Sequence, residues 1–233
     1  MKRVWTIAWT EAMKGAWTIA WMVAVVMAVV GCSAQRSEAQ TASDIERLCE
    51  IRDSMERNRR DLELWKNLSL MAQAMEIVES IPEEGTQYDT YRKACLIDTL
   101  MGCCTETDMA RGAIRVREYQ LYLLGKSGRK NVDMERRIEE KVKQWQDYTD
   151  ESLGTDKYRE RYGVRLAFDA VERTARYEEI LPEAEAKIRT LCPANRRQMG
   201  YCYIYWEKKA EVLREYGIEW ESPAVLNPEV MFD

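Results

Sequence analysis

The sequence predicts an all-α protein, an antiparallel bundle of about five to seven helices that ends in an extended C-terminal tail. Strong helix formers (Glu, Arg, Lys, Ala, Leu and Met) dominate the chain, whereas its 233 residues include only five prolines and eleven glycines. No stretch alternates apolar and polar residues with the two-residue period of a strand. No repeat with the fixed length of a helical solenoid occurs either.

The first helix is expected to begin at Ser43, because Glu46 follows three residues later as in a capping box. From Leu48 onwards, apolar residues recur at heptad-like steps, which is typical of helices in bundles. The apolar stripe continues almost to Pro82. Polar residues crowd at positions 58–61, and a break of the helix there is the alternative.

Glycine and proline divide the rest of the chain into further helices. These are expected at about residues 88–103, 109–125 with Gly125 as C-cap, 131–148, 158–181 ending before Pro182, 184–191, and 195–216 with Gly217 as C-cap. Ile218 or Trp220 is expected to fold back onto the last helix. Residues 222–233 contain two prolines, which predict an extended tail packed along the bundle.

A secretion signal is indicated near the start of the chain. Lys14 precedes an apolar run from Ala16 to Val30, and small Gly31 and then Cys32 follow. The run Val29-Val30-Gly31-Cys32 resembles the lipobox of bacterial lipoproteins. That resemblance implies cleavage before Cys32 and attachment of lipid, including palmitate, to its sulfur. The predicted divisions are therefore a signal peptide at 1–31, the lipidated cysteine with a flexible tether at 32–42, and a single helical domain at 43–233.

Three further alternatives concern this segment. The sequence Met1-Lys-Arg-Val-Trp-Thr-Ile-Ala-Trp9 is echoed from Met13, so translation starting at Met13 would give a signal of ordinary length. An uncleaved anchor needs ~20 apolar residues, more than the run offers. Plain secretion is the other alternative. By resemblance to bacterial lipoproteins, Ser33 after the cysteine favours the outer membrane, with the domain facing the periplasm.

Charge and composition exclude several functions. The net charge is −5, and removal of residues 1–31, with three basic residues and one acidic residue, makes it −7. Such a chain lacks the basic patch that nucleic acid requires. The absence of histidine excludes Ser-His-Asp and Cys-His catalysis and histidine-containing zinc or di-iron sites. No catalytic residues, metal or cofactor are therefore predicted.

Six cysteines follow Cys32, and they are candidates for disulfides in an oxidising envelope. They are Cys49, Cys95, Cys103, Cys104, Cys192 and Cys202. Two cysteines eight residues apart on one helix lie ~12 Å apart along its axis, which is too far for a bridge. Any bridges must therefore join different helices. The alternative is that all six are small buried thiols.

The densest aromatic stretch is Tyr201-Cys-Tyr-Ile-Tyr-Trp206. Tyr201, Tyr205 and Trp206 are the candidate recognition residues, because tyrosine and tryptophan suit contacts with proteins or glycans. A place in the core is the alternative for this stretch. It is also the expectation for a second aromatic set, Trp145, Tyr148, Tyr158, Tyr162 and Tyr177. Carboxylate pairs such as Glu139-Glu140, Glu178-Glu179 and Glu183/Glu185 are expected on solvated helix faces.

These features predict a membrane-tethered envelope lipoprotein that acts as a protein-interaction or assembly module, with an envelope protein as its partner. The alternative is a lipoprotein that binds a glycan or a peptidoglycan fragment. A third class, a carboxylate-based cell-wall hydrolase, needs two carboxylates ~5–9.5 Å apart. Helical spacing meets that condition throughout this chain, so it gives no support for such an enzyme. An exposed aromatic patch would favour a protein partner, whereas a concave pocket with convergent polar groups would favour a ligand.

Overall fold

The computed structural model describes residues 38–83, 89–193 and 198–232. The lipobox-like stretch and Cys32 lie outside the described residues. The chain divides into two units, Met1–Ser43 and Asp44–Asp233, and the described helices belong to the second apart from the first turns of α2. Its elements, with the whole of the first helix included, are α2 Glu38–Arg60, η1 Leu64–Lys66, α3 Asn67–Ser80, α4 Thr90–Met101, η2 Glu106–Met109, α5 Ala110–Ser127, α6 Val132–Thr149, α7 Thr155–Tyr162, η3 Ala170–Arg173, α8 Ala175–Leu191, α9 Tyr201–Glu215 and α10 Pro223–Leu226. The described residues form no strand, and the predicted all-α helical bundle is confirmed.

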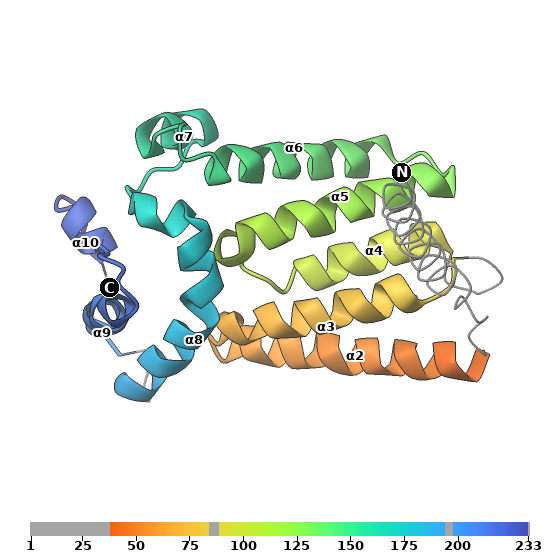
Figure 1. Ribbon diagram of the computed structural model, residues 1–233, viewed down its shortest axis with the longest axis horizontal. Helices are drawn as coiled ribbons and strands as arrows, with labels where there is room; N and C mark the ends of the chain where they lie inside the picture. Colours follow the sequence, from red (N-terminus) through yellow and green to blue (C-terminus); the bar gives the residue numbers. More distant parts are fainter. Residues whose placement is uncertain (1–37, 84–88, 194–197, 233) are drawn as a thin grey trace, which may run out of the picture. The chain divides into compact units, whose positions relative to one another are not determined.

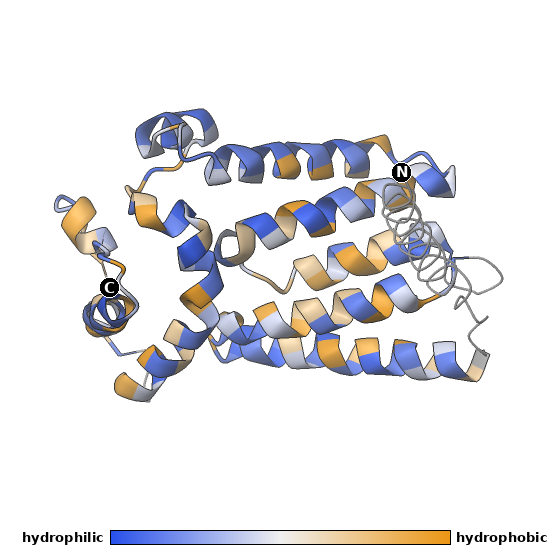
Figure 2. Cartoon of the chain, in the orientation of Figure 1, coloured by the Kyte–Doolittle hydropathy of each residue, from blue (hydrophilic) through white to orange (hydrophobic). Residues whose placement is uncertain are grey.

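Helices α2 to α6 lie side by side, joined by short connections, and α8 runs across one end of this row (Figure 1). There α8 contacts η1, η2 and η3, while α9 packs against α8. Apolar and hydrophilic positions are interspersed along every long helix in Figure 2, as expected of amphipathic helices with one buried side. Among the described helices, none combines the length and apolar character needed to cross a membrane.

The apolar side chains form two separate clusters. The larger one lies among α2 to α7, where Leu48, Met55, Met71, Ile97 and Leu123 are at most 1% exposed. The smaller one joins α8 and α9 and includes Ile218 and Trp220 from the segment after α9. The predicted return of that segment onto the last helix is therefore confirmed.

The predicted first helix is divided in two, which agrees with the alternative that it breaks near positions 58–61. Leu62 has a φ of +58° between α2 and η1, and α3 begins at Asn67. The Asn67 side chain is fully buried and donates hydrogen bonds to the carbonyl oxygens of Met55 (3.0 Å) and Cys103 (2.6 Å). Asn67 thus ties the ends of α2 and α4 to the start of α3. Residues 38–42, predicted as part of the flexible tether, are helical and belong to α2.

Two predicted helix ends are wrong. The C-cap of α5 is Gly128, with a left-handed φ of +65°, and Gly125 lies inside the helix. Likewise α7 ends at Gly163 (φ +66°), whereas one helix was expected through residues 158–181. Glycine takes this conformation with little strain, so several glycines along a helical stretch are competing caps. Which of them ends the helix depends on the surrounding packing.

Pro182 also does not end a helix, because α8 continues through it from Ala175 to Leu191. An interior proline costs about 3 kcal/mol or more in a helix. Buried Leu181, Ala184 and Ile188 on both sides of the proline pack into the smaller cluster. Their burial offsets that cost and merges the two predicted helices into one.

The last long helix begins later than predicted, at Tyr201 after left-handed Gly200, and Gly217 follows its end with a φ of +76°. The predicted tail contains one short helix, α10. After it, buried Asn227 exchanges hydrogen bonds with the backbone of Ala167, accepting one at 2.7 Å and donating one at 2.9 Å. The tail is thereby held against the segment that connects α7 to η3.

Candidate functional site

The aromatic run at the start of α9 contains the predicted recognition residues. Tyr205 packs toward α8, where its hydroxyl donates a hydrogen bond to the carboxylate of buried Glu185. Tyr201 stacks on Tyr205 with ring centroids 6.4 Å apart, and its hydroxyl accepts a hydrogen bond from Arg189 at 3.1 Å. Burial raises the pKa of Tyr205 well above its ordinary value. Tyr205 therefore contributes mainly to the packing of α9 on α8.

Trp206 lies on another side of α9, in contact with Phe232 (ring centroids 4.9 Å apart) and Tyr203 (5.6 Å). Large apolar side chains at the end of α8, around the start of α9 and next to Phe232 in the chain are exposed. They are Leu191 (45%), Met199 (91%), Tyr203 (46%) and Met231 (89%). We call these four residues together with Trp206 the α9 face. Figure 2 shows hydrophobic positions, interspersed with hydrophilic ones, at the free end of α8.

Lys209 fixes the orientation of α9. Its ammonium lies over the rings of Trp220 (4.8 Å), Tyr177 (5.3 Å) and Tyr205 (5.9 Å). The Trp220 indole N–H in turn donates to Glu172 at 2.6 Å. Cation–π contacts of this kind stabilise by about 0.5–2 kcal/mol each. They help to hold the side of α9 that bears Lys209, Tyr205 and buried Val212 against α8 and Trp220, whereas Tyr203 stays exposed.

The second aromatic set lies mainly in the core, as the sequence predicts. Trp145, Tyr148, Tyr158 and Tyr177 are each at most 5% exposed. Burial raises the pKa of the Tyr148 and Tyr158 hydroxyls above their ordinary range. Side chains with such high pKa values are unsuited to act as bases at neutral pH. These four residues therefore support the fold, whereas Tyr162 is partly buried and lines a groove beside α6.

Arg173 is the polar centre of this aromatic core and is 2% exposed. Its guanidinium donates to four backbone carbonyl oxygens at and beyond the end of α6. The distances are 2.6 Å to Tyr148, 2.6 Å to Asp150, 3.1 Å to Asp147 and 3.4 Å to Leu153. A cation in this place satisfies carbonyls that a helix end leaves unpaired and complements the helix dipole.

All six described cysteines are free thiols in this structure. Cys49 is exposed, whereas Cys103 is buried and donates to the Glu56 carboxylate at 3.3 Å. Burial raises the pKa of Cys103 to about 11 and that of Cys104 to about 12. No group of three or more cysteine, aspartate or glutamate side chains suited to a metal occurs in the described part of the chain.

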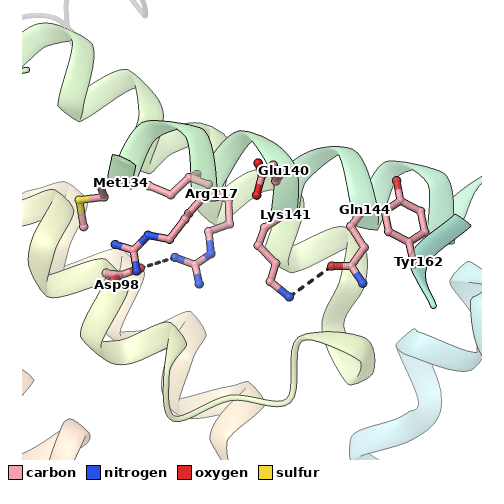
Figure 3. A pocket seen from close by; sticks show the side chains of 9 residues that line it. Asp98, Arg117, Met134, Glu140, Lys141, Gln144 and Tyr162 are labelled. Atoms are coloured by element: carbon pink, nitrogen blue, oxygen red, sulfur yellow. Dashed lines mark hydrogen bonds and ion pairs between the residues drawn. The ribbon is translucent and has the colours of Figure 1, made fainter. Parts of the chain in front are cut away.

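A polar groove of about 500 Å³ lies between α6 and its neighbours α4, α5 and α7. Figure 3 shows Arg117 pointing toward Asp98, and Lys141 toward Gln144, along its floor. The Arg117 guanidinium donates to Asp98 and Glu106, both at 2.7 Å, and to Gln120 at 2.9 Å. The central charge of this groove is thus neutralised within the protein.

A second groove, of about 390 Å³, lies between α3, α5 and α8. Its apolar lining comes from Leu68, Met71, Ala72, Met75, Met109, Val116 and Pro182. Charged and polar groups from Glu79, Asp108, Arg115, Tyr119 and Glu178 complete it. We call it the methionine groove, after the three methionines in its lining. Methionine is flexible and polarisable, which suits a surface that adapts to a bound molecule.

The two carboxylates of the methionine groove that lie nearest the junction with α8 differ in their environments. Glu178 accepts hydrogen bonds from the backbone N–H of Arg111 (3.1 Å) and Gly112 (3.2 Å) at the start of α5, and from the Arg111 guanidinium at 3.4 Å. The Asp108 carboxyl has no hydrogen bond or ion pair within the described residues. Burial raises the pKa of Asp108 to about 6, against the opposing effect of Lys209. Glu178 is therefore a fully paired carboxylate, whereas Asp108 is not.

The prediction that Glu178 and Glu185 lie on solvated faces is wrong. Glu178 caps α5 from another helix, and Glu185 is 5% exposed beside Tyr205. The sequence drew no attention to Asp108, Met71 or Met75 as site residues. The spacing of the two methionines by one turn puts them on one face of α3, but only their packing near η2 and α8 forms a groove.

No family model matches this chain, and comparisons with curated proteins and with solved structures find no significant match.

Proposed function

We propose that the chain is an envelope lipoprotein, anchored to the outer membrane through lipid on Cys32, and that its helical domain binds another protein through the α9 face. The resemblance to the lipobox supports the anchor. Several acyl chains on one cysteine would hold the domain stably at a membrane surface, whereas a single chain binds only reversibly. The domain would then meet its partner in the periplasm.

The α9 face is the observation that supports binding of a protein. Nine large apolar side chains are exposed among the described residues, and Leu191, Met199, Tyr203 and Met231 belong to this face. Contiguous exposed apolar patches mark interaction sites in soluble domains, and interface cores are rich in aromatic residues and methionine. A protein partner would cover these side chains and leave the Tyr205–Glu185 contact undisturbed.

The anchor is tested by labelling cells with palmitate. Label is expected in the wild-type protein and absent from Cys32→Ala. Palmitate that persists on Cys32→Ala contradicts lipidation at this cysteine.

The partner surface is tested by site-specific photo-crosslinking in intact cells. A crosslinking residue at Tyr203 should form a discrete adduct with one protein, whereas the same residue at exposed Tyr122 on α5 should not. The double variant Met199→Ser/Met231→Ser should weaken the adduct. The matched control, Val132→Ser/Leu166→Ser, removes two exposed apolar side chains elsewhere and should leave it unchanged. Equal adducts at positions 203 and 122, or none at 203, would count against the α9 face.

A further inference from the structure

We propose that the methionine groove binds a small organic ammonium ion, with its apolar body against the methionines and its cationic group beside Asp108. The groove lies between α3, α5 and α8, so it is separate from the α9 face. The inference therefore does not depend on the protein-binding proposal. It rests on the shape, lining and charge of the groove.

The volume and lining suit a small molecule. Ligand pockets usually measure about 300–1,000 Å³ and combine apolar walls with a few polar groups, and the methionine groove, at about 390 Å³, falls within that range. Met71 and Met75 from α3 and Met109 from η2 are part of the apolar lining. Gly112 leaves space in the groove, because a Cβ at this position would lie only 3.2 Å from the Met109 methyl group.

Charge decides which ligand fits. Glu79, Asp108 and Glu178 line the groove together with one cation, Arg115. Glu178 is already paired, whereas the half-buried Asp108 carboxyl has no donor among the described residues. A buried or half-buried carboxylate without a donor is costly. A ligand ammonium beside it would supply the missing donor and the opposite charge, whereas an anion or a neutral alcohol would not supply both.

Several charged groups surround Asp108 from the neighbouring elements. They are Lys209 on α9, Glu185 and Glu178 on α8, Glu172 in η3, Arg115 on α5 and Glu79 on α3. Lys209 is held by three aromatic rings and forms no ion pair with Asp108. Its charge lowers the pKa of Asp108, while Glu185 and Glu172 raise it together with burial. The surroundings therefore leave this carboxyl titrating near pH 6.

Binding of a cation favours the ionised carboxylate, so affinity should rise as the pH rises through the pKa of Asp108, which is about 6. If only the ionised form binds, the apparent affinity changes in proportion to its population, by about tenfold between pH 5 and pH 7. Burial, Glu185 and Glu172 raise this pKa and Lys209 lowers it, so the pH dependence of binding is assigned to Asp108.

The experiment uses the full chain in detergent and three probes of similar size: benzylamine, benzyl alcohol and benzoate. Saturation-transfer NMR titrations give the dissociation constant of each. Benzylamine should bind saturably and at least tenfold more tightly than the other two at pH 7. Asp108→Asn should remove this preference and the pH dependence, whereas Asp156→Asn, which removes one exposed charge on α7, should change neither.

A blocking variant tests the location independently of charge. Ala72 is exposed and lines the groove, so Ala72→Trp should fill it and abolish benzylamine binding. Gln73→Trp, at the next exposed position of α3 but outside the lining, should bind as wild type does. The proposal is overturned if benzylamine shows no saturable binding, if benzyl alcohol binds equally well, or if Asp108→Asn and Ala72→Trp retain wild-type affinity.

Discussion

Replacing Arg173 by methionine removes the guanidinium at the end of α6 while keeping a long apolar stem in the aromatic core. Arg173 donates four hydrogen bonds to backbone carbonyls, two of them at 2.6 Å. Its guanidinium carbon also lies 5.9 Å from the ring centre of Tyr148 and 5.7 Å from that of Tyr158. In Arg173→Met these carbonyls lose their donor in a place that water reaches poorly.

The size of the effect follows from opposing terms. A hydrogen bond from a charged donor stabilises by about 1.5–3 kcal/mol, and a cation at a helix C-terminus adds up to about 2 kcal/mol. Against this stands the desolvation of a buried guanidinium, which costs several kcal/mol. Removing one partner from a buried charged network typically destabilises by about 3–5 kcal/mol, and we expect this for Arg173→Met. That is a large part of the 5–15 kcal/mol that stabilises a typical domain.

Urea unfolding followed by circular dichroism measures the difference in free energy of unfolding. The matched control is Arg176→Met, because Arg176 on α8 is exposed and, in the part of the chain that the structure describes, pairs with exposed Glu179 alone. We expect a change below about 0.5 kcal/mol there. Arg173→Lys keeps the charge but cannot span four acceptors with a planar fork, so its loss should be intermediate. A loss below about 1 kcal/mol for Arg173→Met would refute the capping role.

Three further predictions concern other polar groups. Hydrogen bonds from Lys143, Tyr162 and Arg161 lower the pKa of Asp147 to about 2. The stability that this carboxylate contributes is therefore present above pH 4 and is lost as the pH falls toward 2. In Asp147→Asn, the melting temperature should decline less steeply with falling pH. Exposed Cys49 should react with iodoacetamide at pH 8, whereas Cys103 and Cys104 should react only after unfolding, as peptide mass spectrometry would reveal. Asn67→Ala removes the side-chain donor from two buried carbonyls and should cost about 2–4 kcal/mol in urea unfolding, whereas a near-neutral result would contradict its tie between α2 and the segment after α4.

Local sequence signals identified parts of the candidate sites but not their arrangement. The aromatic run from Tyr201 to Trp206 is visible in the sequence, yet it does not reveal that Tyr205 turns toward Glu185 while Tyr203 stays exposed. A helix with aromatic residues on several sides can bury any one of them. Which of them is buried depends on the contacts of Lys209 with aromatic rings that come from three separate segments.

The sequence by itself determined the class of fold and most of its helices. Helix propensity and apolar periodicity act over one or two turns, so they predict the amphipathic stripe from Leu48 and the return of Trp220 after Gly217. Tertiary structure decided that α8 continues through Pro182, that Arg173 caps α6, and that Asp108 is left without a donor beside three methionines. Each of these depends on groups far apart in the sequence, whose burial and pairing energies exceed local preferences and exist only once the helices have packed.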